Sequence, residues 1–172
     1  MSCSNCSDVE SFGGGHRNCV CEVVREIKRI QDAATNNDCN PCGFTCFSEP
    51  LGGLVSPTRN QADTRVFTLL TKDGTPFFST FLDENGPDCD CVSVFFRVND
   101  FVDDCCVTLS VLRPLNTQKQ EVDLLNEYGT GLNLRKLCKV RHFELTGTCI
   151  TVDLRCFCGI NCIADVFLDV CD

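Results

Sequence analysis

Apolar residues follow a helical period in one segment near the start of the chain. The positions are Val20, Val23, Val24, Ile27 and Ile30. Residues three or four apart lie on one face of a helix, and the charged residues between them fall mostly on the other face. Asn18 precedes this segment and is a residue type that favours helix N-caps. The pattern predicts one helix over residues 19–34.

Beyond residue 60 the apolar residues alternate with polar ones, which is the period of a half-buried β-strand. Strands are predicted over residues 64–71, 76–82, 92–98, 107–111, 137–145 and 150–154. Asp73-Gly74 predicts a hairpin turn, because both residues tolerate the positive φ of tight turns, and Thr146-Gly147 predicts a second one. Residues 116–135 carry a weaker pattern that allows a short strand near 120–125 and then a loop.

One helix followed by consecutive antiparallel strands predicts a mainly β protein. We expect an antiparallel β-sandwich or flattened barrel with one N-terminal helix, packed on it or reaching outward. Residues 1–18 contain three consecutive glycines and little apolar material, and are predicted as a flexible, cysteine-containing arm. Residues 19–50 are predicted as the helix and a cysteine-rich loop, and residues 51–172 as the β domain.

The composition limits the classes of partner. A chain of 172 residues with 43% apolar residues can bury a core of its own. The net charge is −9 and the basic residues are scattered, which argues against nucleic acid as a partner. The N-terminus lacks the basic start and apolar stretch of a secretory signal, and the chain has no apolar run long enough to cross a membrane. We therefore expect synthesis in a cytosol.

Cysteine is the most unusual part of the composition. The chain has 17 cysteines, a density typical of small secreted disulfide scaffolds. Here the secretory signal is missing and the core is sufficient, so folding does not require these cysteines. Because the number is odd, complete oxidation would leave at least one cysteine to pair outside the molecule.

The surroundings of the cysteines divide them into two groups. Those in polar, turn-rich or mobile segments are predicted to form disulfides between subunits: Cys3, Cys6, Cys19, Cys21, Cys39, Cys42 and Cys46. Those within or beside the strands are predicted as intramolecular disulfides or buried thiols: Cys89, Cys91, Cys105, Cys106, Cys138, Cys149, Cys156, Cys158, Cys162 and Cys171. Cys105 and Cys106 are neighbours at the start of a strand, point to opposite faces, and need different partners.

A zinc-stabilised binding module is the main alternative. Cys39 and Cys42 have a spacing found in zinc sites, and His16 is a conceivable further ligand. Structural zinc sites usually combine two cysteine pairs that each have a two-residue gap. The second cluster, Cys156 to Cys162, has gaps of one and three residues instead, so the match is partial. A thiol redox protein is a weaker alternative, because the Cys39-Cys42 pair follows the helix instead of opening one.

Catalysis is not expected. A thiol nucleophile requires a histidine within reach, and the chain has only His16 in the arm and His142 in a predicted strand. No glycine motif that would hold a phosphate is present, and no cofactor is expected.

Three strings resemble one family along most of the chain. They are NCVCEVVREI, VFFRVNDFVDDCCVTLSVLRPL and CITVDLRCFCGINC. In the same order, they resemble segments of the CotY, CotZ and ExsY family of spore coat, crust and exosporium basal-layer proteins from endospore-forming bacteria. The paired Cys105-Cys106 before a strand that ends in Arg113-Pro114, together with the terminal CFC-x-I-x-C, makes the resemblance specific.

The resemblance implies a structural protein of the spore surface, made in the mother-cell cytoplasm and deposited around the forespore. It implies homo-oligomeric rings, hexamers, joined into a two-dimensional hexagonal lattice that is cross-linked by disulfides and forms a protective, semi-permeable barrier. Other spore coat or exosporium proteins are the further partners implied. Subunits would assemble while their thiols are reduced and would be locked together when the surroundings become oxidising.

Overall fold

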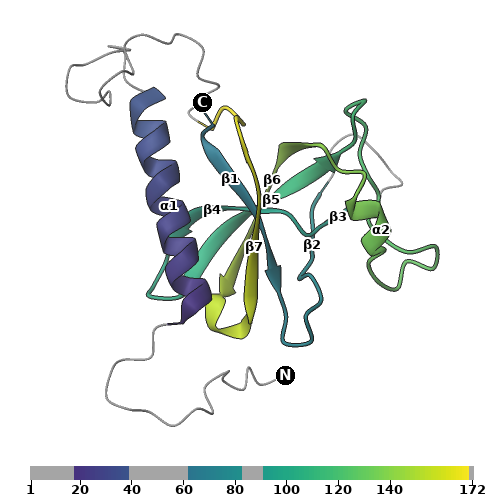
Figure 1. Ribbon diagram of the computed structural model, residues 1–172, viewed down its shortest axis with the longest axis horizontal. Coiled ribbons are helices and arrows are strands. Elements are labelled where there is room, and N and C mark those ends of the chain that lie inside the picture. Colours follow the sequence, from purple (N-terminus) through teal and green to yellow (C-terminus); the bar gives the residue numbers. More distant parts are fainter. Residues whose placement is uncertain (1–17, 39–61, 83–90, 171–172) are drawn as a thin grey trace.

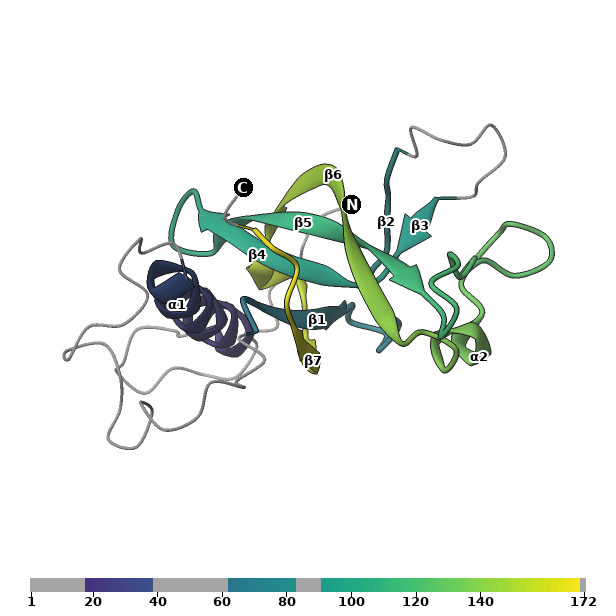
Figure 2. The same ribbon diagram turned by 90° about the horizontal axis from the view of Figure 1, so that it is seen from above.

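The computed structural model describes residues 18–38, 62–82 and 91–170 (Figures 1 and 2). The elements in chain order are α1 (Cys19–Asp38), β1 (Thr64–Leu70), β2 (Ser79–Thr80), β3 (Val92–Ser93), β4 (Phe96–Phe101), β5 (Cys106–Leu115), α2 (Leu134–Leu137), β6 (His142–Asp153), the 3-10 turn η2 (Leu154–Cys156) and β7 (Gly159–Val166). The predicted mainly β, antiparallel class with an N-terminal helix is confirmed. Within the described residues, neither helix is long and apolar enough to cross a bilayer.

Five strands form one antiparallel sheet in the order β6-β5-β4-β1-β7. β2 and β3 form a separate two-stranded sheet. β6 and β7 follow each other in the chain, yet they lie at opposite ends of the strand order. The chain therefore has to cross the end of the sheet between them, and η2 lies in this connection.

The helix α1 packs on one face of the sheet (Figure 1). Its buried stripe contains Val20, Val24 and Ile27, which share a core with Phe67 and Val98 of the strands. The helix is longer than predicted because it continues to Asp38. It begins after Asn18, as predicted, since the Cys21 backbone N–H donates a 3.1 Å hydrogen bond to the Asn18 side-chain oxygen.

Gln31 extends the buried stripe of α1 with a polar side chain. Its Nε2 donates to the Val98 carbonyl oxygen at 2.9 Å, and its Oε1 accepts from the Arg65 backbone N–H at 3.2 Å. Both ends of the amide are therefore satisfied in a buried position, where an unpaired polar group would be costly. Gln31 joins the helix to β4 and β1.

A second core lies on the opposite face of the sheet. Val66 and Leu112 belong to it, whereas their chain neighbours Phe67 and Val111 belong to the helix-side core. This division follows from the alternation of side chains along a strand. The second core is closed by residues from the segment between β5 and β6, including Leu124 and α2, which Figure 1 shows on the side away from α1.

The predicted hairpin turn at Thr146-Gly147 is wrong. Residues 142–153 form one continuous strand, β6, which pairs with β5 along its length. Ser110 pairs with Cys149 and Leu112 with Leu145, so three residues of β6 lie opposite one residue of β5 in a bulge. Gly147 has a φ of 72°, so it supplies a left-handed conformation inside a strand instead of in a hairpin turn.

Two further predictions about strands need correction. The predicted strand 92–98 is divided into β3 and β4, because Val94 and Phe95 are both buried and interrupt the alternation. The Asp73-Gly74 turn is present, with the Gly74 N–H bonded to the Thr71 carbonyl, but its second arm pairs with β1 only through the Leu70–Pro76 bridge. The principal partners of β1 are β4 and β7.

Candidate functional site: the cysteines of the helix and the sheet

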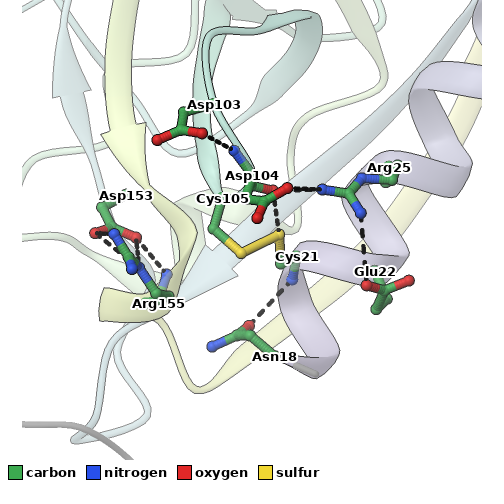
Figure 3. The surroundings of a disulfide bond; sticks show 9 residues. All are labelled: Asn18, Cys21, Glu22, Arg25, Asp103, Asp104, Cys105, Asp153 and Arg155. Atoms are coloured by element: carbon green, nitrogen blue, oxygen red, sulfur yellow. Dashed lines mark hydrogen bonds and ion pairs between the residues drawn. A yellow bond between two sulfur atoms is a disulfide. The ribbon is translucent and has the colours of Figure 1, made fainter. Parts of the chain in front are cut away.

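A disulfide between Cys21 and Cys105 joins the first turn of α1 to the start of β5 (Figure 3). The Cα atoms are 5.5 Å apart, a normal distance for this bond, and the residues are separated by 84 positions in the sequence. Cys21 is only 2% exposed and belongs to the helix-side core. The bond therefore closes a long loop through the interior of the subunit.

Backbone contacts hold both ends of this disulfide. On the helix side, Asn18 caps α1 one turn before Cys21. On the sheet side, the Cys105 carbonyl accepts a 2.9 Å hydrogen bond from the Leu154 N–H, the first residue of η2. The bond thus lies where α1, β5 and the connection between the two edge strands meet.

A charged group surrounds the disulfide at the surface (Figure 3). The Arg25 guanidinium lies 3.7 Å from the carboxylates of both Glu22 and Asp104, and 5.4 Å from the centre of the Phe101 ring. These charged groups are about half exposed or more, so each ion pair contributes little to stability. Arg25 joins α1 to the β4–β5 loop, since its Nη2 also donates a 2.5 Å hydrogen bond to the Asp104 carbonyl oxygen.

Asp153 and Arg155 form a further charged pair in this region. The Arg155 guanidinium donates to both carboxylate oxygens of Asp153, at distances of 2.8 to 3.1 Å. These hydrogen bonds are the main reason why the pKa of Asp153 lies below its usual value. The Arg155 backbone N–H also donates to Asp153, which caps η2.

The location of Cys21 differs from the sequence-based expectation. Its closeness to the predicted mobile arm predicts a disulfide between subunits for Cys21. In the structure it pairs with Cys105 of the same chain, since it lies on the buried side of α1 next to Val20 and Val24. Cys106, the neighbour of Cys105, is half-buried and takes no part in this bond.

The other cysteines of the described residues are distributed over several elements. Cys91 and Cys156 are also disulfide-bonded. Cys158 is exposed, in the connection before β7. Free thiols in the described part of the chain belong to Cys19, Cys106, Cys138, Cys149 and Cys162. All of these except Cys106 are exposed, so they are accessible to another subunit.

Two of the free thiols lie on the outer strands of the sheet. Cys149 lies on β6, where its sulfur accepts a 3.4 Å hydrogen bond from the Asn99 side-chain amide. Cys162 lies on β7, opposite Phe67 of β1. The subunit thus presents an exposed thiol on the strand at each end of the five-stranded sheet.

Comparison with known proteins agrees with the sequence resemblance. A family model described as Spore coat protein Z matches residues 4–165, which is most of the chain. The chain belongs to the spore coat protein Z family. It is 36% identical over 149 residues to Spore coat protein Z of Bacillus subtilis (strain 168), a match that covers 84% of this chain and 88% of that protein. No solved structure matches the chain.

In this member of the spore coat protein Z family, several predicted site residues lie outside the described residues. They are Cys3, Cys6, His16, Cys39, Cys42, Cys46, Cys89 and Cys171. His142 is described and is an exposed residue at the start of β6. Among residues 18–38, 62–82 and 91–170, no group of three or more His, Cys, Asp or Glu side chains could hold a metal ion.

The structure also identifies a buried carboxylate that the sequence analysis missed. Asp63, just before β1, is 2% exposed and accepts hydrogen bonds from the backbone N–H groups of Leu168 at 2.9 Å and Val170 at 3.2 Å. It fixes the segment that follows β7. Its partners are more than 100 residues away, so an acidic residue beside a predicted strand carried no local signal of this role.

Proposed function

We propose that this protein is a structural subunit of the bacterial spore surface, where copies of it assemble into a disulfide-cross-linked sheet. The layer is the coat, the crust or the exosporium basal layer, and the protein is made in the mother-cell cytoplasm. Rings, hexameric in our proposal, join into a two-dimensional lattice that acts as a protective, semi-permeable barrier. The role is structural and not enzymatic, and other spore coat proteins are further partners.

The observation that carries this proposal is the separation of buried and exposed cysteines. The Cys21–Cys105 bond stabilises the fold from inside, whereas Cys149 and Cys162 leave thiols exposed on the two outer strands. Exposed thiols are a liability in a protein that must remain single, because they invite cross-linking. In a protein that has to be cross-linked they are useful. Membership of the spore coat protein Z family supports this interpretation.

The set of proposed cross-linking cysteines changes accordingly. Cys21 is no longer proposed as a cross-linking cysteine, because it forms a disulfide with Cys105 of the same chain. The remaining proposed cysteines are Cys3, Cys6, Cys19, Cys39, Cys42 and Cys46, to which the exposed free thiols of Cys138, Cys149 and Cys162 are added. Each new bond removes two protons and two electrons from two thiols, which a small-molecule disulfide or dioxygen accepts when the mother cell lyses.

Noncovalent contacts have to bring the subunits together before these bonds form. Phe78, Leu82 and Tyr128 are exposed, and Phe78 lines an open hollow of about 440 Å³ between the β2–β3 sheet and the 125–131 loop. Burial of such apolar side chains drives association. A head-to-tail contact that closes gives a ring, and a second contact between rings gives a sheet. Weak contacts suffice, because each subunit is held by several neighbours at once.

Electron microscopy of the purified chain, with and without reductant, tests the proposal. We expect ordered arrays in both conditions, which only after oxidation resist boiling in detergent. Zinc analysis of the same sample should show no stoichiometric metal. A variant with serine at Cys19, Cys138, Cys149 and Cys162 should form arrays that dissolve more readily, whereas a Cys21→Ala/Cys105→Ala variant should keep its cross-links. A monodisperse protein with bound zinc would overturn the proposal in favour of a metal-stabilised binding module.

A further inference from the structure

The strand β7 forms an open edge of the five-stranded sheet. Within the described residues β1 is its only partner, so the backbone groups on its other side have no strand to pair with. Unpaired strand edges are templates for pairing with another chain, and proteins usually protect them with charges, prolines or bulges. The two outer strands of this sheet differ in how far they are protected.

The outer strand β6 carries several protective features. Three of its residues bulge around Gly147, and His142, Glu144 and Asp153 are charged or titratable. Bulges bend a strand and interrupt regular pairing. The bulge divides β6 into two regular stretches, residues 142–145 and 149–153, and His142 and Asp153 lie at their outer ends.

Protection of β7 is weaker. Its one charged residue, Asp165, is held by Arg65 of the neighbouring strand, whose Nε and Nη2 donate to the two carboxylate oxygens at 2.7 and 2.6 Å. Its bulge contains a single extra residue, Ile163, which is 47% exposed. Phe167, just beyond the strand, is 57% exposed. The edge therefore carries exposed apolar side chains beside the polar Asn161, and its one charge is paired within the subunit.

We propose that β7 pairs in antiparallel fashion with β7 of a second copy, with Cys162 opposite Cys162 across a two-fold axis. This interface rests on the proposed function and specifies one contact of the lattice. In this register Asp165 faces Gly159 of the other copy and Ile160 faces Ala164, so no like charges oppose one another. A two-fold contact between identical strands needs no second, complementary surface.

The geometry of antiparallel pairing suits a disulfide at Cys162. Directly opposite residues have Cα atoms about 4.5 to 5.5 Å apart. Disulfides span Cα separations of about 4.4 to 6.8 Å. Both Cys162 side chains lie on the same face of the extended sheet, because residues opposite each other share a face. The bond would convert a reversible strand pairing into a covalent one.

Oxidised glutathione can serve as the oxidant in this step. One Cys162 thiol loses its proton, and its sulfur attacks the glutathione disulfide, forming a mixed disulfide and releasing one glutathione thiolate. The Cys162 thiolate of the second copy then attacks the Cys162 sulfur of the mixed disulfide and releases the second glutathione thiolate. Two protein thiols are oxidised, one glutathione disulfide is reduced to two thiols, and the released protons return to them.

A pair of matched cysteine variants tests this interface in the full chain. Cys162→Ser and Cys149→Ser each remove one exposed thiol from an outer strand. Only Cys162→Ser should abolish the Cys162–Cys162 disulfide. After oxidation by glutathione disulfide, peptide mass spectrometry should find a Cys162–Cys162 cross-link in the wild type and in Cys149→Ser. Its absence from the cross-linked wild-type arrays would overturn the interface and leave the proposed function standing. Failure of the wild type to associate at all would overturn both.

A second pair of variants tests the pairing without the covalent bond. Ile163→Lys on β7 adds a charge to the proposed edge, and Leu145→Lys on β6 adds one to a similarly exposed apolar position, 42% against 47%. With reductant present, Ile163→Lys should weaken self-association, measured by sedimentation, by about tenfold or more. Leu145→Lys should change it less than Ile163→Lys, with circular dichroism showing that both variants fold. Equal weakening by the two substitutions would contradict pairing through β7.

Discussion

Removal of the Cys21–Cys105 bond should lower the free energy of unfolding by a predictable amount. The bond joins residues 84 positions apart, and the chain-entropy relation gives about 4.6 kcal/mol at 25 °C for a loop of that length. Measured values are typically about 2 to 4 kcal/mol. Because Cys91 and Cys156 are also disulfide-bonded, the unfolded chain is already constrained. We therefore expect Cys21→Ala/Cys105→Ala to lower the free energy of unfolding by about 2 to 4 kcal/mol, less than the chain-entropy relation gives.

Urea unfolding followed by circular dichroism measures this loss. Cys21→Ala, Cys105→Ala and the double variant should lose similar amounts, because either single substitution already breaks the bond. The matched control is Cys106→Ala, which removes the neighbouring half-buried thiol and should cost about 1 kcal/mol or less. With strong reductant present, the difference between wild type and double variant should largely disappear. If the double variant lost as much stability as the two single variants together, the reasoning would be refuted, because both substitutions break the same bond.

Two other perturbations test the sheet itself. Gly147→Ala places a side chain at a φ of 72°, where nothing lies within 4 Å, so backbone strain alone should destabilise the protein by about 1 to 2 kcal/mol. Gly131→Ala, at a glycine without positive φ, should cost less in the same urea assay, and equal losses would contradict the bulge geometry. Hydrogen bonds from Arg65 lower the folded-state pKa of Asp165. The pair therefore stabilises the protein at pH values above the unfolded-state pKa of about 3.9. This stabilisation is lost as the pH falls through the lower folded-state pKa. Asp165→Asn should therefore flatten the decline in stability below about pH 4, and an unchanged pH profile would contradict this role.

The sequence was most informative where the physical cause is local. Asn18 predicted the start of α1, because an N-cap acts on backbone groups within one turn. The glycine at position 147 predicted a turn, which is wrong, because the positive φ that it supplies also fits a bulge. The choice between a turn and a bulge depends on whether residues 148–153 continue to pair with β5. The residues next to Gly147 do not indicate this pairing, because β5 is distant in the sequence.

The partner of Cys21 could not be predicted for a related reason. Cysteine pairing depends on which segments the tertiary fold brings together, and Cys105 is 84 residues away. A signal for burial was nevertheless present, because Cys21 lies three residues before Val24 and therefore on the apolar stripe of the helix. Proximity to the arm was the weaker argument. The same stripe ends in Gln31. Its burial could not be predicted from the apolar pattern, because its side chain is polar.

The crossing between β6 and β7 has a mechanical consequence. Five strands span four gaps of about 4.8 Å, or about 19 Å across a flat sheet. The connection from Asp153 to Gly159 has six Cα steps, which reach about 20 to 22 Å at full extension. The 3-10 turn η2 rises only about 2 Å per residue and shortens the connection below the width of a flat sheet, so the sheet has to curl toward its own ends. In a layer held through both outer strands, tension would tighten this connection before the strands could peel apart. The covalent backbone, together with the hydrogen bond from Leu154 to Cys105, would then carry the load across each subunit.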